Sequence, residues 1–499
     1  TVDGASLAQG AKPVGSEVRR LSGREASPVY KKDAIDLGGE ERIVDFGDWA
    51  VRLAARNDGV AYRFETKRPG RIRVNGESAP LVMPEGYVRC WANRTGAFGQ
   101  EESIPESLAA ESLTTVPGGP KNWTGKSLVY LPFVYTAAGV CVAVTESDVR
   151  DYPIWNFERT EEMRRAQDGG SVSFASRFAG WPLKTARWAS WHGREGAVKE
   201  GGRKVVVTDH ADYLTDTEGT RTFPWRTFVL ADSFAGFCEA DIVRALATPA
   251  AAGTDFSWVR PGKVAWDWWN AFDNQGEGGC NTKTYERFID FAAENGIEYV
   301  ILDEGWSEFL NIWKFHPNVD VPRIIAYGRQ KGVGIILWMA WAQVLGDEER
   351  VARHFAKLGA KGFKVDFMDR GDAQVARFLE KFADVCAKER MLVDYHGVYR
   401  PVGLSRRFPN IVNYEGIHGL EQMKWFERTE KEMMENDVRA FYLRLTAGPM
   451  DYTPGAMINH PLDGSYRGSE KFPGSVGTRC RQMAMMTMYF APLQMLCDS

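Results

Sequence analysis

The second half of the sequence is constrained most by a regular alternation of short apolar runs and longer amphipathic stretches. Apolar runs of strand length recur after residue 255, and residues with helical spacing lie between them. Such alternation predicts a parallel sheet, because each helix carries the chain back to start the next strand. The candidate strands are residues 263–268, 299–303, 334–339, 362–367, 392–396, 411–415, 441–447 and 491–496. This series predicts an α/β fold with a (β/α)₈ TIM barrel.

Amphipathic stretches predict the helices of this barrel at residues 282–295, 322–331, 348–358, 373–388 and 422–436. The last candidate strand ends three residues before the chain does, so no eighth helix follows it. We therefore expect a barrel that is truncated at its C-terminal end.

The first half of the sequence has a different pattern, in which short alternating or apolar runs are separated by Gly, Pro and Asn. These runs lie at residues 43–46, 49–53, 61–64, 128–130, 140–145, 204–208 and 221–230. Their spacing predicts an antiparallel β-sandwich. The small-residue segment 247–253 marks the expected boundary, which gives domains at residues 1–254 and 255–499.

Composition excludes some functions. The net charge is only −4, so the sequence does not indicate nucleic-acid binding, and no run of 18 apolar residues predicts a membrane-spanning helix. The 17 Trp residues suit a sugar-binding protein, because an indole ring can stack on a pyranose face. Core packing is the alternative use of these rings.

Acidic side chains follow most of the candidate barrel strands. In a TIM barrel the active site lies at the carboxyl ends of the strands. Glycoside hydrolysis needs one carboxylate that attacks or activates water and another that protonates the leaving oxygen. The strand-end residues with polar side chains are Asp267, Asp303, Glu304, Asp366, His396, Glu415 and Asp451.

Several motifs make the chain similar to glycoside hydrolase family 97. The motifs are residues 263–270 (KVAWDWWN), 299–306 (YVILDEGW), 364–370 (KVDFMDR), 394–421 and 491–499. The resemblance is weak before residue 120 and strong after residue 255. It implies an N-terminal β-sandwich, a catalytic barrel and a small C-terminal β-domain, and we expect the third part to be absent from this chain.

The resemblance also distinguishes two mechanistic branches. Inverting members carry a His-Glu pair where this chain has His396 and Gly397, so the Glu that helps to activate water is missing. Retaining members carry an Asp nucleophile at the position of Asp366 and an acid/base Glu at the position of Glu421. The resemblance therefore implies that Asp366 is the nucleophile and Glu421 the general acid/base.

Members of the family hold a calcium ion beside the reacting sugar, and Ca²⁺ takes six to eight oxygen ligands. By motif position, the resemblance implies Glu415 as a ligand, Glu146 as a ligand from the sandwich, and Glu421 as a third. Because inverting members also use the Glu at position 397 as a ligand, water is expected to take one coordination position beside Gly397.

Four further residues are candidate substrate contacts: Asp303, Lys364, His396 and Trp266. Lys364 lies two residues before Asp366 and so points to the same side of the strand. Asp303 stands in a DEGW setting similar to that of other α-galactosidase barrels. For Trp266, as for Trp338, the sequence leaves open whether the ring lines the site or packs in the core.

The expected function is that of a retaining, exo-acting α-galactosidase with calcium as cofactor and an oligosaccharide or glycoside as substrate. An α-glucosidase or a β-L-arabinopyranosidase of the same family is the alternative. A carbohydrate-binding protein without catalysis is disfavoured, because Asp366 and Glu421 are retained. The family resemblance implies a bacterial periplasmic or secreted protein.

Overall fold

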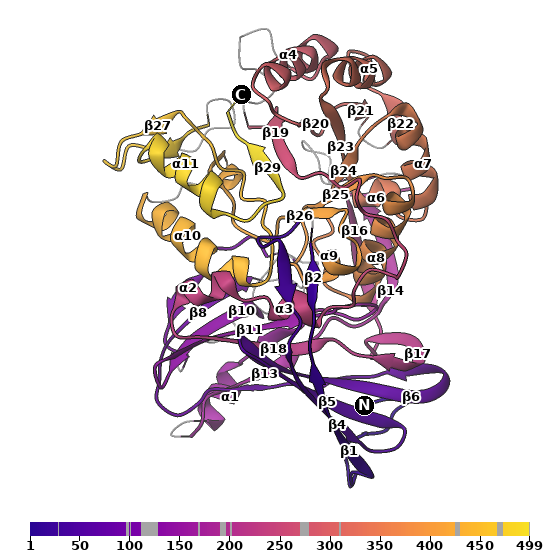
Figure 1. The fold of residues 1–499 in the computed structure, drawn as a ribbon, viewed down its shortest axis with the longest axis vertical. Helices are drawn as coiled ribbons and strands as arrows, with labels where there is room; N and C mark the ends of the chain where they lie inside the picture. Colours follow the sequence, from indigo (N-terminus) through magenta and orange to yellow (C-terminus); the bar gives the residue numbers. More distant parts are fainter. Residues whose placement is uncertain are drawn as a thin grey trace.

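The computed structural model describes residues 1–499 except 28, 96–98, 100, 111–127, 168–169, 190–195, 200–201, 270–278, 309–310, 425–429, 467–472 and 499. Figure 1 shows a large antiparallel sheet, built from the first part of the chain, below a barrel built from the later part. Among the described helices, none is long and apolar enough to cross a membrane.

The antiparallel sheet contains 13 strands. In chain order these are β1 (Gly15–Leu21), β4 (Gly39–Asp45), β5 (Trp49–Arg56), β6 (Gly59–Val74), β7 (Leu81–Val82), β8 (Tyr87–Thr95), β9 (Glu106–Leu108), β10 (Leu128–Ala137), β11 (Val140–Ser147), β12 (Asn156–Glu158), β13 (Ser173–Arg177), β17 (Thr215–Thr222) and β18 (Trp225–Ala231). The main path is β1-β4-β5-β6-β18-β11-β10-β12-β13-β7, while β17 pairs with β6 and β8 pairs with β10 and β9.

Smaller elements complete this part of the chain. They are β2 (Arg24–Ala26) paired with β3 (Ala34–Asp36), the three-stranded sheet of β14 (Pro182–Trp188), β15 (Ala197–Val198) and β16 (Lys204–His210), and the helices α1 (Glu161–Ala166), α2 (Phe234–Glu239) and α3 (Ile242–Leu246). We refer to β1–β18 together with α1–α3 as the sandwich.

The central strand β10 shows why this region behaves as a sandwich. Its residues are apolar almost throughout, and alternate side chains point to opposite faces. Leu131 and Phe133 belong to one core cluster, whereas Val134 belongs to a second cluster that includes Phe237 of α2 and Ile242 of α3. Both faces of the strand are therefore buried, and the sequence prediction of an antiparallel sandwich is confirmed.

Seven parallel strands form the barrel. They are β19 (Gly262–Trp266), β20 (Tyr299–Leu302), β23 (Gly334–Ala340), β24 (Gly362–Asp366), β25 (Leu392–Tyr395), β26 (Ile411–Tyr414) and β29 (Leu493–Leu496), in the spatial order β26-β25-β24-β23-β20-β19-β29. Each matches one of the predicted strands, so the prediction of a TIM-barrel fold is confirmed.

Helices follow the barrel strands as the amphipathic pattern predicts. The long ones are α4 (Thr282–Glu294), α5 (Val321–Lys331), α7 (Glu348–Leu358) and α8 (Ala373–Lys388). The side chains of Asn281, Asp320 and Asp372 cap α4, α5 and α8 by accepting hydrogen bonds from first-turn N–H groups. Shorter elements are β21 (Ser307–Glu308), β22 (Asn311–Phe315), α6 (Trp341–Val344), α9 (Leu404–Arg407), β27 (Asn459–His460), β28 (Ser475–Val476) and α11 (Arg479–Met488).

Two sequence predictions near the C-terminus are wrong. The strand predicted at 441–447 is the end of α10 (Glu430–Leu443) and the 3₁₀ turn η3 (Arg444–Thr446). Buried Arg444 holds this turn by donating hydrogen bonds to the carbonyl oxygens of Glu415 and Gly416, at 2.8 Å each. The helix predicted at 422–436 starts later, at Glu430, because residues up to 424 belong to the 3₁₀ helix η2 (Leu420–Lys424) and 425–429 lie outside the described residues.

An extended segment, rather than a strand at 441–447, lies between β26 and β29. The N–H of Asp451 donates to Tyr414 O at 2.7 Å, and the N–H of Met450 donates to Phe490 O at 3.1 Å. The side chain of Asn413 crosses directly to Leu493 O at 2.9 Å. The barrel is closed here by single hydrogen bonds, which place Asp451 at the carboxyl end of β26.

Candidate active site

Asp366 is the last residue of β24 and stands at the carboxyl end of the barrel strands. The first four residues of this strand are buried, whereas Asp366 is partly exposed, so its carboxylate faces the barrel mouth. Oδ1 accepts a hydrogen bond from the N–H of Phe367 at 2.6 Å, and Oδ2 accepts one from Trp338 Nε1 at 3.1 Å. These two donors fix the direction of the carboxylate.

Gly397 lies against Asp366 so closely that only glycine fits. A Cβ atom at this position would stand 2.5 Å from Phe367 N and 2.8 Å from Asp366 Oδ1. The backbone of Gly397 also has φ +52°, in the left-handed region that favours glycine. The place that a side chain at residue 397 would take is therefore filled by Asp366 and the backbone that follows it.

His396 lies between carboxylates and is almost completely buried. Its Nε2 is 2.5 Å from Asp451 Oδ2 and 3.7 Å from Asp394 Oδ2, and its Nδ1 is 3.4 Å from Glu415 Oε2. Burial and the Lys364 charge each lower the pKa of His396, but Asp394 and Asp451 outweigh them, and the pKa rises to about 9. Asp394 and Asp451 therefore favour the protonated form of the ring.

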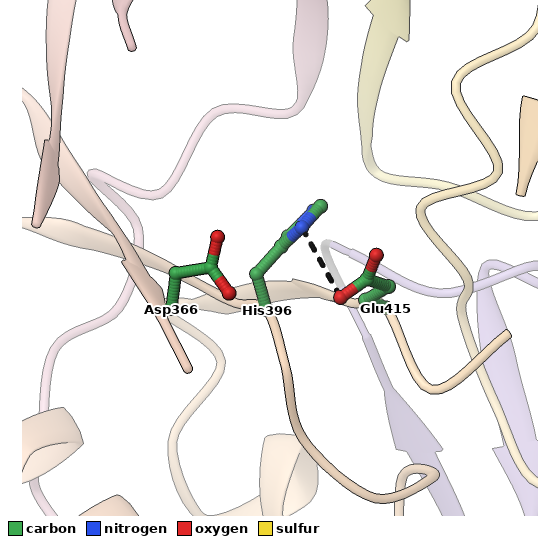
Figure 2. Close-up of side chains that lie close together, drawn as sticks. All are labelled: Asp366, His396 and Glu415. Carbon is green, nitrogen blue, oxygen red and sulfur yellow. Dashed lines mark ion pairs between the residues drawn. The ribbon is translucent and has the colours of Figure 1, made fainter. Parts of the chain in front are cut away.

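Figure 2 shows Asp366 and Glu415 on either side of the His396 ring, with the ion pair between His396 and Glu415 drawn as a dashed line. Potential ligand atoms of these three side chains all lie within 4.8 Å of one another. Glu415 Oε2 also accepts a hydrogen bond from the N–H of Gly397 at 2.7 Å. Glu415, which follows β26, therefore lies close to Asp366, which ends β24.

Glu421 lies in η2 and is buried, with its N–H donating to Thr453 Oγ1 at 3.3 Å. Its charge acts on Glu415: burial raises the pKa of Glu415 well above its usual range, and repulsion from Glu102, Glu421 and Asp366, with a hydrogen bond to the Glu421 side chain, raises it further. Glu421, Glu415 and Asp366 therefore belong to one electrostatic cluster.

A buried ion pair supports the other side of the site. Lys364 Nζ donates to Asp303 Oδ2 at 3.0 Å, and Trp266 Nε1 donates to the same oxygen at 2.7 Å. Burial alone would raise the pKa of Asp303, but the Lys364 charge and the hydrogen bonds lower it. The pKa of Lys364 is raised in turn, since Asp303 and nearby acids outweigh the effect of burial. Both groups are therefore charged.

The donor set suits a hard divalent cation. Carboxylate oxygens are the ligands that Ca²⁺ prefers, and two overlapping groups of acids share His396 here. Besides Asp366 and Glu415, the second group contains Asp394 and Asp451. The mutual repulsion that raises the pKa of Glu415 is what a bound cation relieves. These residues can therefore hold a metal ion.

The sequence of this chain matches two family models. Residues 3–249 match the model for the N-terminal domain of glycosyl hydrolase 97, and residues 265–417 match the model for glycoside hydrolase 97 itself. A retaining alpha-galactosidase from Bacteroides thetaiotaomicron is 34% identical over 513 residues, which cover 100% of this chain and 73% of that protein. The chain belongs to glycoside hydrolase family 97. It is therefore a glycoside hydrolase.

More distant relatives are similar to this chain over most of its length. A probable retaining alpha-galactosidase from Streptomyces bingchenggensis is 26% identical over 91% of this chain, which spans 63% of that protein. A family 97 enzyme from Pseudoalteromonas sp. strain K8, solved with acarbose, has a TM-score of 0.75 at 18% identity, covering 97% of this chain and 72% of its own. A beta-arabinopyranosidase has a TM-score of 0.73 at 19% identity, covering 97% and 73%. These likenesses show the fold.

In this family 97 enzyme, the structure brings together most of the residues predicted from the sequence. Asp366, His396, Glu415 and Glu421 form one cluster, and Asp303 and Lys364 form an adjacent ion pair. His396 is engaged by Asp451 and Glu415 through its two ring nitrogens. Its position therefore favours the orientation of acids over a hydrogen bond to a substrate hydroxyl.

The expected substrate contact by Trp266 does not fit its position. The side chain is completely buried, and its only polar atom donates to Asp303. A ring without exposed surface cannot stack on a sugar. Trp266 instead orients Asp303 through this hydrogen bond. Trp338 is the tryptophan that touches Asp366.

Glu146 does not join the acid cluster in this structure. It lies in β11 and is completely buried, and its two carboxylate oxygens accept hydrogen bonds from Arg226 (2.7 Å), Arg400 and the N–H of Trp155 (3.0 Å). Burial raises the pKa of Glu146, while the two arginines lower it. With its oxygens bound by arginines, Glu146 does not fit the predicted calcium ligand in this arrangement.

Sequence reasoning missed another acid that the sandwich brings to the site, Glu102. Gln422 Nε2 donates to Glu102 Oε2 at 3.0 Å. Burial, with repulsion from Asp369, Asp366 and Glu421, raises the pKa of Glu102 to about 8. The only signal in the sequence was a pair of acids at residues 101–102 in a loop, which no strand or helix pattern connects with the barrel.

Proposed function

We propose that this family 97 enzyme is a retaining, exo-acting α-galactosidase that uses calcium. The 34% identical relative along the whole chain is named a retaining alpha-galactosidase, and the more distant relative is named a probable one. The proposal extends their activity to this chain, which spans about three quarters of the first protein and less than two thirds of the second.

The observation that carries the proposal is the contact between Asp366 and Gly397. A side chain at residue 397 and the present position of Asp366 exclude one another, because a Cβ would stand 2.8 Å from Asp366 Oδ1. The chain therefore has a carboxylate where a nucleophile is needed and no room for a base at residue 397. This arrangement favours double displacement over a single inverting displacement.

In the proposed reaction, Asp366 attacks the anomeric carbon of an α-galactoside and Glu421 protonates the departing oxygen. The covalent intermediate is β-linked, and water then displaces Asp366 while Glu421 accepts a proton from that water. A retaining pair needs carboxylates about 5–5.5 Å apart. The N–H of Phe367 and the indole of Trp338 hold Asp366 toward the substrate.

Lys364 and Asp303 supply a fixed pair of charges beside the reacting sugar. Asp303 Oδ1 is bonded to the N–H of Glu304, and Oδ2 is bonded to Lys364 and Trp266. In the proposal, the remaining N–H bonds of the Lys364 ammonium and the lone pairs of Asp303 bind sugar hydroxyls. Because both groups are buried, such contacts discriminate strongly between sugars that differ in one hydroxyl.

We propose that the resident cation is Ca²⁺ and that Glu415 and Glu421 are among its ligands, with Glu102 in place of Glu146 as the acid from the sandwich. A bound calcium ion would supply Lewis-acid assistance at the leaving oxygen. The mutual repulsion of these three acids supports this ligand set. Glu102 and Glu421 both raise the pKa of Glu415, and Glu421 also raises the pKa of Glu102.

The decisive experiment is a panel of nitrophenyl glycosides followed by proton NMR of the first product. The proposal predicts the highest kcat/KM with the α-galactoside and release of the α-anomer before mutarotation. A preference for the α-glucoside or the β-L-arabinopyranoside replaces the substrate assignment but leaves the mechanism intact. Early appearance of the anomer opposite to that of the substrate, which is the β-anomer from the α-galactoside, contradicts Asp366 as nucleophile, and a base such as Asp303 or Asp394 must then activate water. We further propose a periplasmic or secreted location, which cell fractionation tests.

A further inference from the structure

The segment that follows Asp366 has an unusual backbone. Phe367 has φ +65° and Asp369 has φ +46°, and bulky residues other than glycine rarely adopt this left-handed region. Such a conformation persists only where neighbouring groups hold it. In this conformation the N–H of Phe367 reaches Asp366 Oδ1 at 2.6 Å. The direction of the proposed nucleophile therefore depends on what holds Phe367.

The Phe367 ring contacts Trp338 and two cations of the sandwich, Arg203 and Lys204, of which Lys204 Nζ stands 5.4 Å from the ring centroid. Trp338 makes an edge contact with the ring, with centroids 6.0 Å apart and an interplanar angle of 78°. The guanidinium carbon of Arg203 stands 4.3 Å from the ring centroid, which is a cation–π contact. Trp338 also donates to Asp366 Oδ2, so ring and nucleophile share one neighbour.

Arg203 is itself fixed from two directions. Its Nε donates to Glu304 Oε1 at 3.1 Å and its Nη2 donates to Glu304 Oε2, a bidentate pair with the residue after Asp303. Its backbone N–H donates to Trp188 O at 2.9 Å, at the end of β14. The guanidinium is therefore held in one orientation over the Phe367 ring.

Arg203 comes from the sandwich, and other sandwich groups hold the rest of the same segment. Lys204 forms an ion pair with Asp369, and the N–H of Ile154 donates to Gly371 O at 2.9 Å. Arg370 Nη1 donates to Val205 O at 3.3 Å. The loop after the nucleophile strand is thus contacted by the sandwich along residues 367–371.

We propose that Arg203 is a positioning residue for the nucleophile: through the Phe367 ring and Glu304 it holds the backbone whose N–H directs Asp366. This proposal rests on the proposed function, in which Asp366 attacks the anomeric carbon. It gives the sandwich a part in catalysis that is separate from substrate binding and from metal binding.

The first experiment compares Arg203→Ala with Arg203→Lys and with Arg187→Ala on a nitrophenyl α-galactoside. Arg187 is the matched control, because it lies in β14 next to Trp188, whose carbonyl oxygen accepts the Arg203 N–H, and it donates to Leu345 O of the barrel at 3.0 Å. We expect Arg203→Ala to lower kcat on the order of 100-fold, the usual effect of a misplaced reacting group, with KM within about threefold. Arg203→Lys should recover part of the loss.

Three results overturn the proposal. One is a kcat of Arg203→Ala within about threefold of the parent enzyme. Another is a raised KM at unchanged kcat, which makes Arg203 a substrate contact. The last is an equal loss in Arg187→Ala, which assigns the effect to general loosening between sandwich and barrel.

The second experiment separates this proposal from the proposed function. In Asp366→Gly, azide takes the place of the nucleophile, so the rate of azide rescue should be the same with and without Arg203→Ala. If azide fails to rescue Asp366→Gly at all, the assignment of Asp366 fails, independently of Arg203. If rescue occurs but Arg203→Ala slows it on the order of 100-fold, Arg203 acts on the substrate or the acid, and the positioning role is wrong.

Discussion

At the residue scale, Asp366 and Gly397 lie so close together that a side chain at residue 397 would meet the Asp366 carboxylate. The carboxylate is oriented by Phe367 N–H and Trp338 Nε1, while Gly397 closes the space behind it. The same Gly397 N–H donates to Glu415. One glycine therefore touches the proposed nucleophile and orients a proposed metal ligand, so its replacement should affect both.

We predict that Gly397→Ala lowers kcat by at least 100-fold, because the new Cβ would meet Phe367 N at 2.5 Å and displace Asp366. The matched control is Gly86→Ala, where φ is +74° but no atom lies within 4 Å of the added Cβ. Steady-state kinetics and thermal melting of both variants separate the clash from the cost of a left-handed alanine. Wild-type activity in Gly397→Ala would show that the contact with Asp366 is unimportant.

Asp366→Gly should abolish turnover while the fold is retained, because the variant lacks the group that attacks the anomeric carbon. Added azide should restore reaction and give a glycosyl azide of inverted configuration, which NMR identifies. Asp372→Ala is a useful control, since Asp372 caps α8 and pairs with Arg370 nearby. That variant should lose stability without azide-dependent rescue. Residual hydrolysis by Asp366→Gly without any azide product contradicts the assignment.

At the scale of elements, α10 and α11 meet through Asp437. This residue accepts a hydrogen bond from the Tyr452 hydroxyl and stands 3.2 Å from Arg481 of α11. Burial raises its pKa from 3.8 to about 6, although Arg481 and Tyr452 act in the opposite direction. Folding therefore favours the protonated form of Asp437. Its ionised form, which predominates at neutral pH, makes the packing of α10 against α11 less stable.

The pH dependence of stability tests this contact. A group whose folded pKa is raised contributes stability below its unfolded pKa of 3.8, and this contribution is lost as the pH rises through about 6. The full difference corresponds to about 3 kcal/mol. Asp437→Asn should remove this loss, so its free energy of unfolding relative to wild type should rise between pH 4.5 and 7.5.

Urea denaturation at both pH values measures this change. The control is Asp384→Asn, an exposed carboxylate paired with Lys388 within one helix, which should show almost no difference. An Asp437→Asn variant whose stability follows the wild type at both pH values would contradict the raised pKa.

At the scale of the whole molecule, the buried side chain of Arg400 joins the barrel to the sandwich. Arg400, from the loop after β25, pairs with Glu101 at 2.5 Å and with Glu146, and Glu146 also pairs with Arg226. Glu146 and Arg226 are opposite residues of β11 and β18. Because these side chains are buried, removal of Glu146 takes away one of two acids from each arginine and leaves Arg400 with Glu101 and Arg226 with Glu77.

Comparison of Glu146→Gln with Glu415→Gln distinguishes this structural role from metal binding. Glu146→Gln should lower the free energy of unfolding by about 3 kcal/mol, since Arg400 and Arg226 lose a buried partner. Its calcium affinity, measured by titration calorimetry, should stay within about threefold of wild type. Glu415→Gln should weaken calcium binding at least tenfold, and chelation of the wild type should lower activity until Ca²⁺ is restored. Equal weakening in both variants would return Glu146 to the metal site.

Local patterns were sufficient to predict much of the architecture. Apolar runs with strand length predicted seven barrel strands, and amphipathic spacing predicted α4, α5, α7 and α8. Strand ends identified Asp303, Asp366 and Glu415, because the carboxyl ends of parallel strands meet at one mouth. The prediction failed at 441–447, where buried Arg444 stabilises a helical turn through contacts with Glu415 and Gly416 that are distant in sequence.

The sequence by itself determined the barrel, the sandwich and the family, since these depend on periodicity and on motifs within short segments. Tertiary structure alone decided which side chains meet. Trp266 is buried below Asp303, Glu146 is bound by two arginines, and Glu102 reaches the site from the sandwich. These outcomes depend on how loops from the two parts of the chain come together. Burial and charge balance at that interface depend on three-dimensional contacts, which no local sequence pattern encodes.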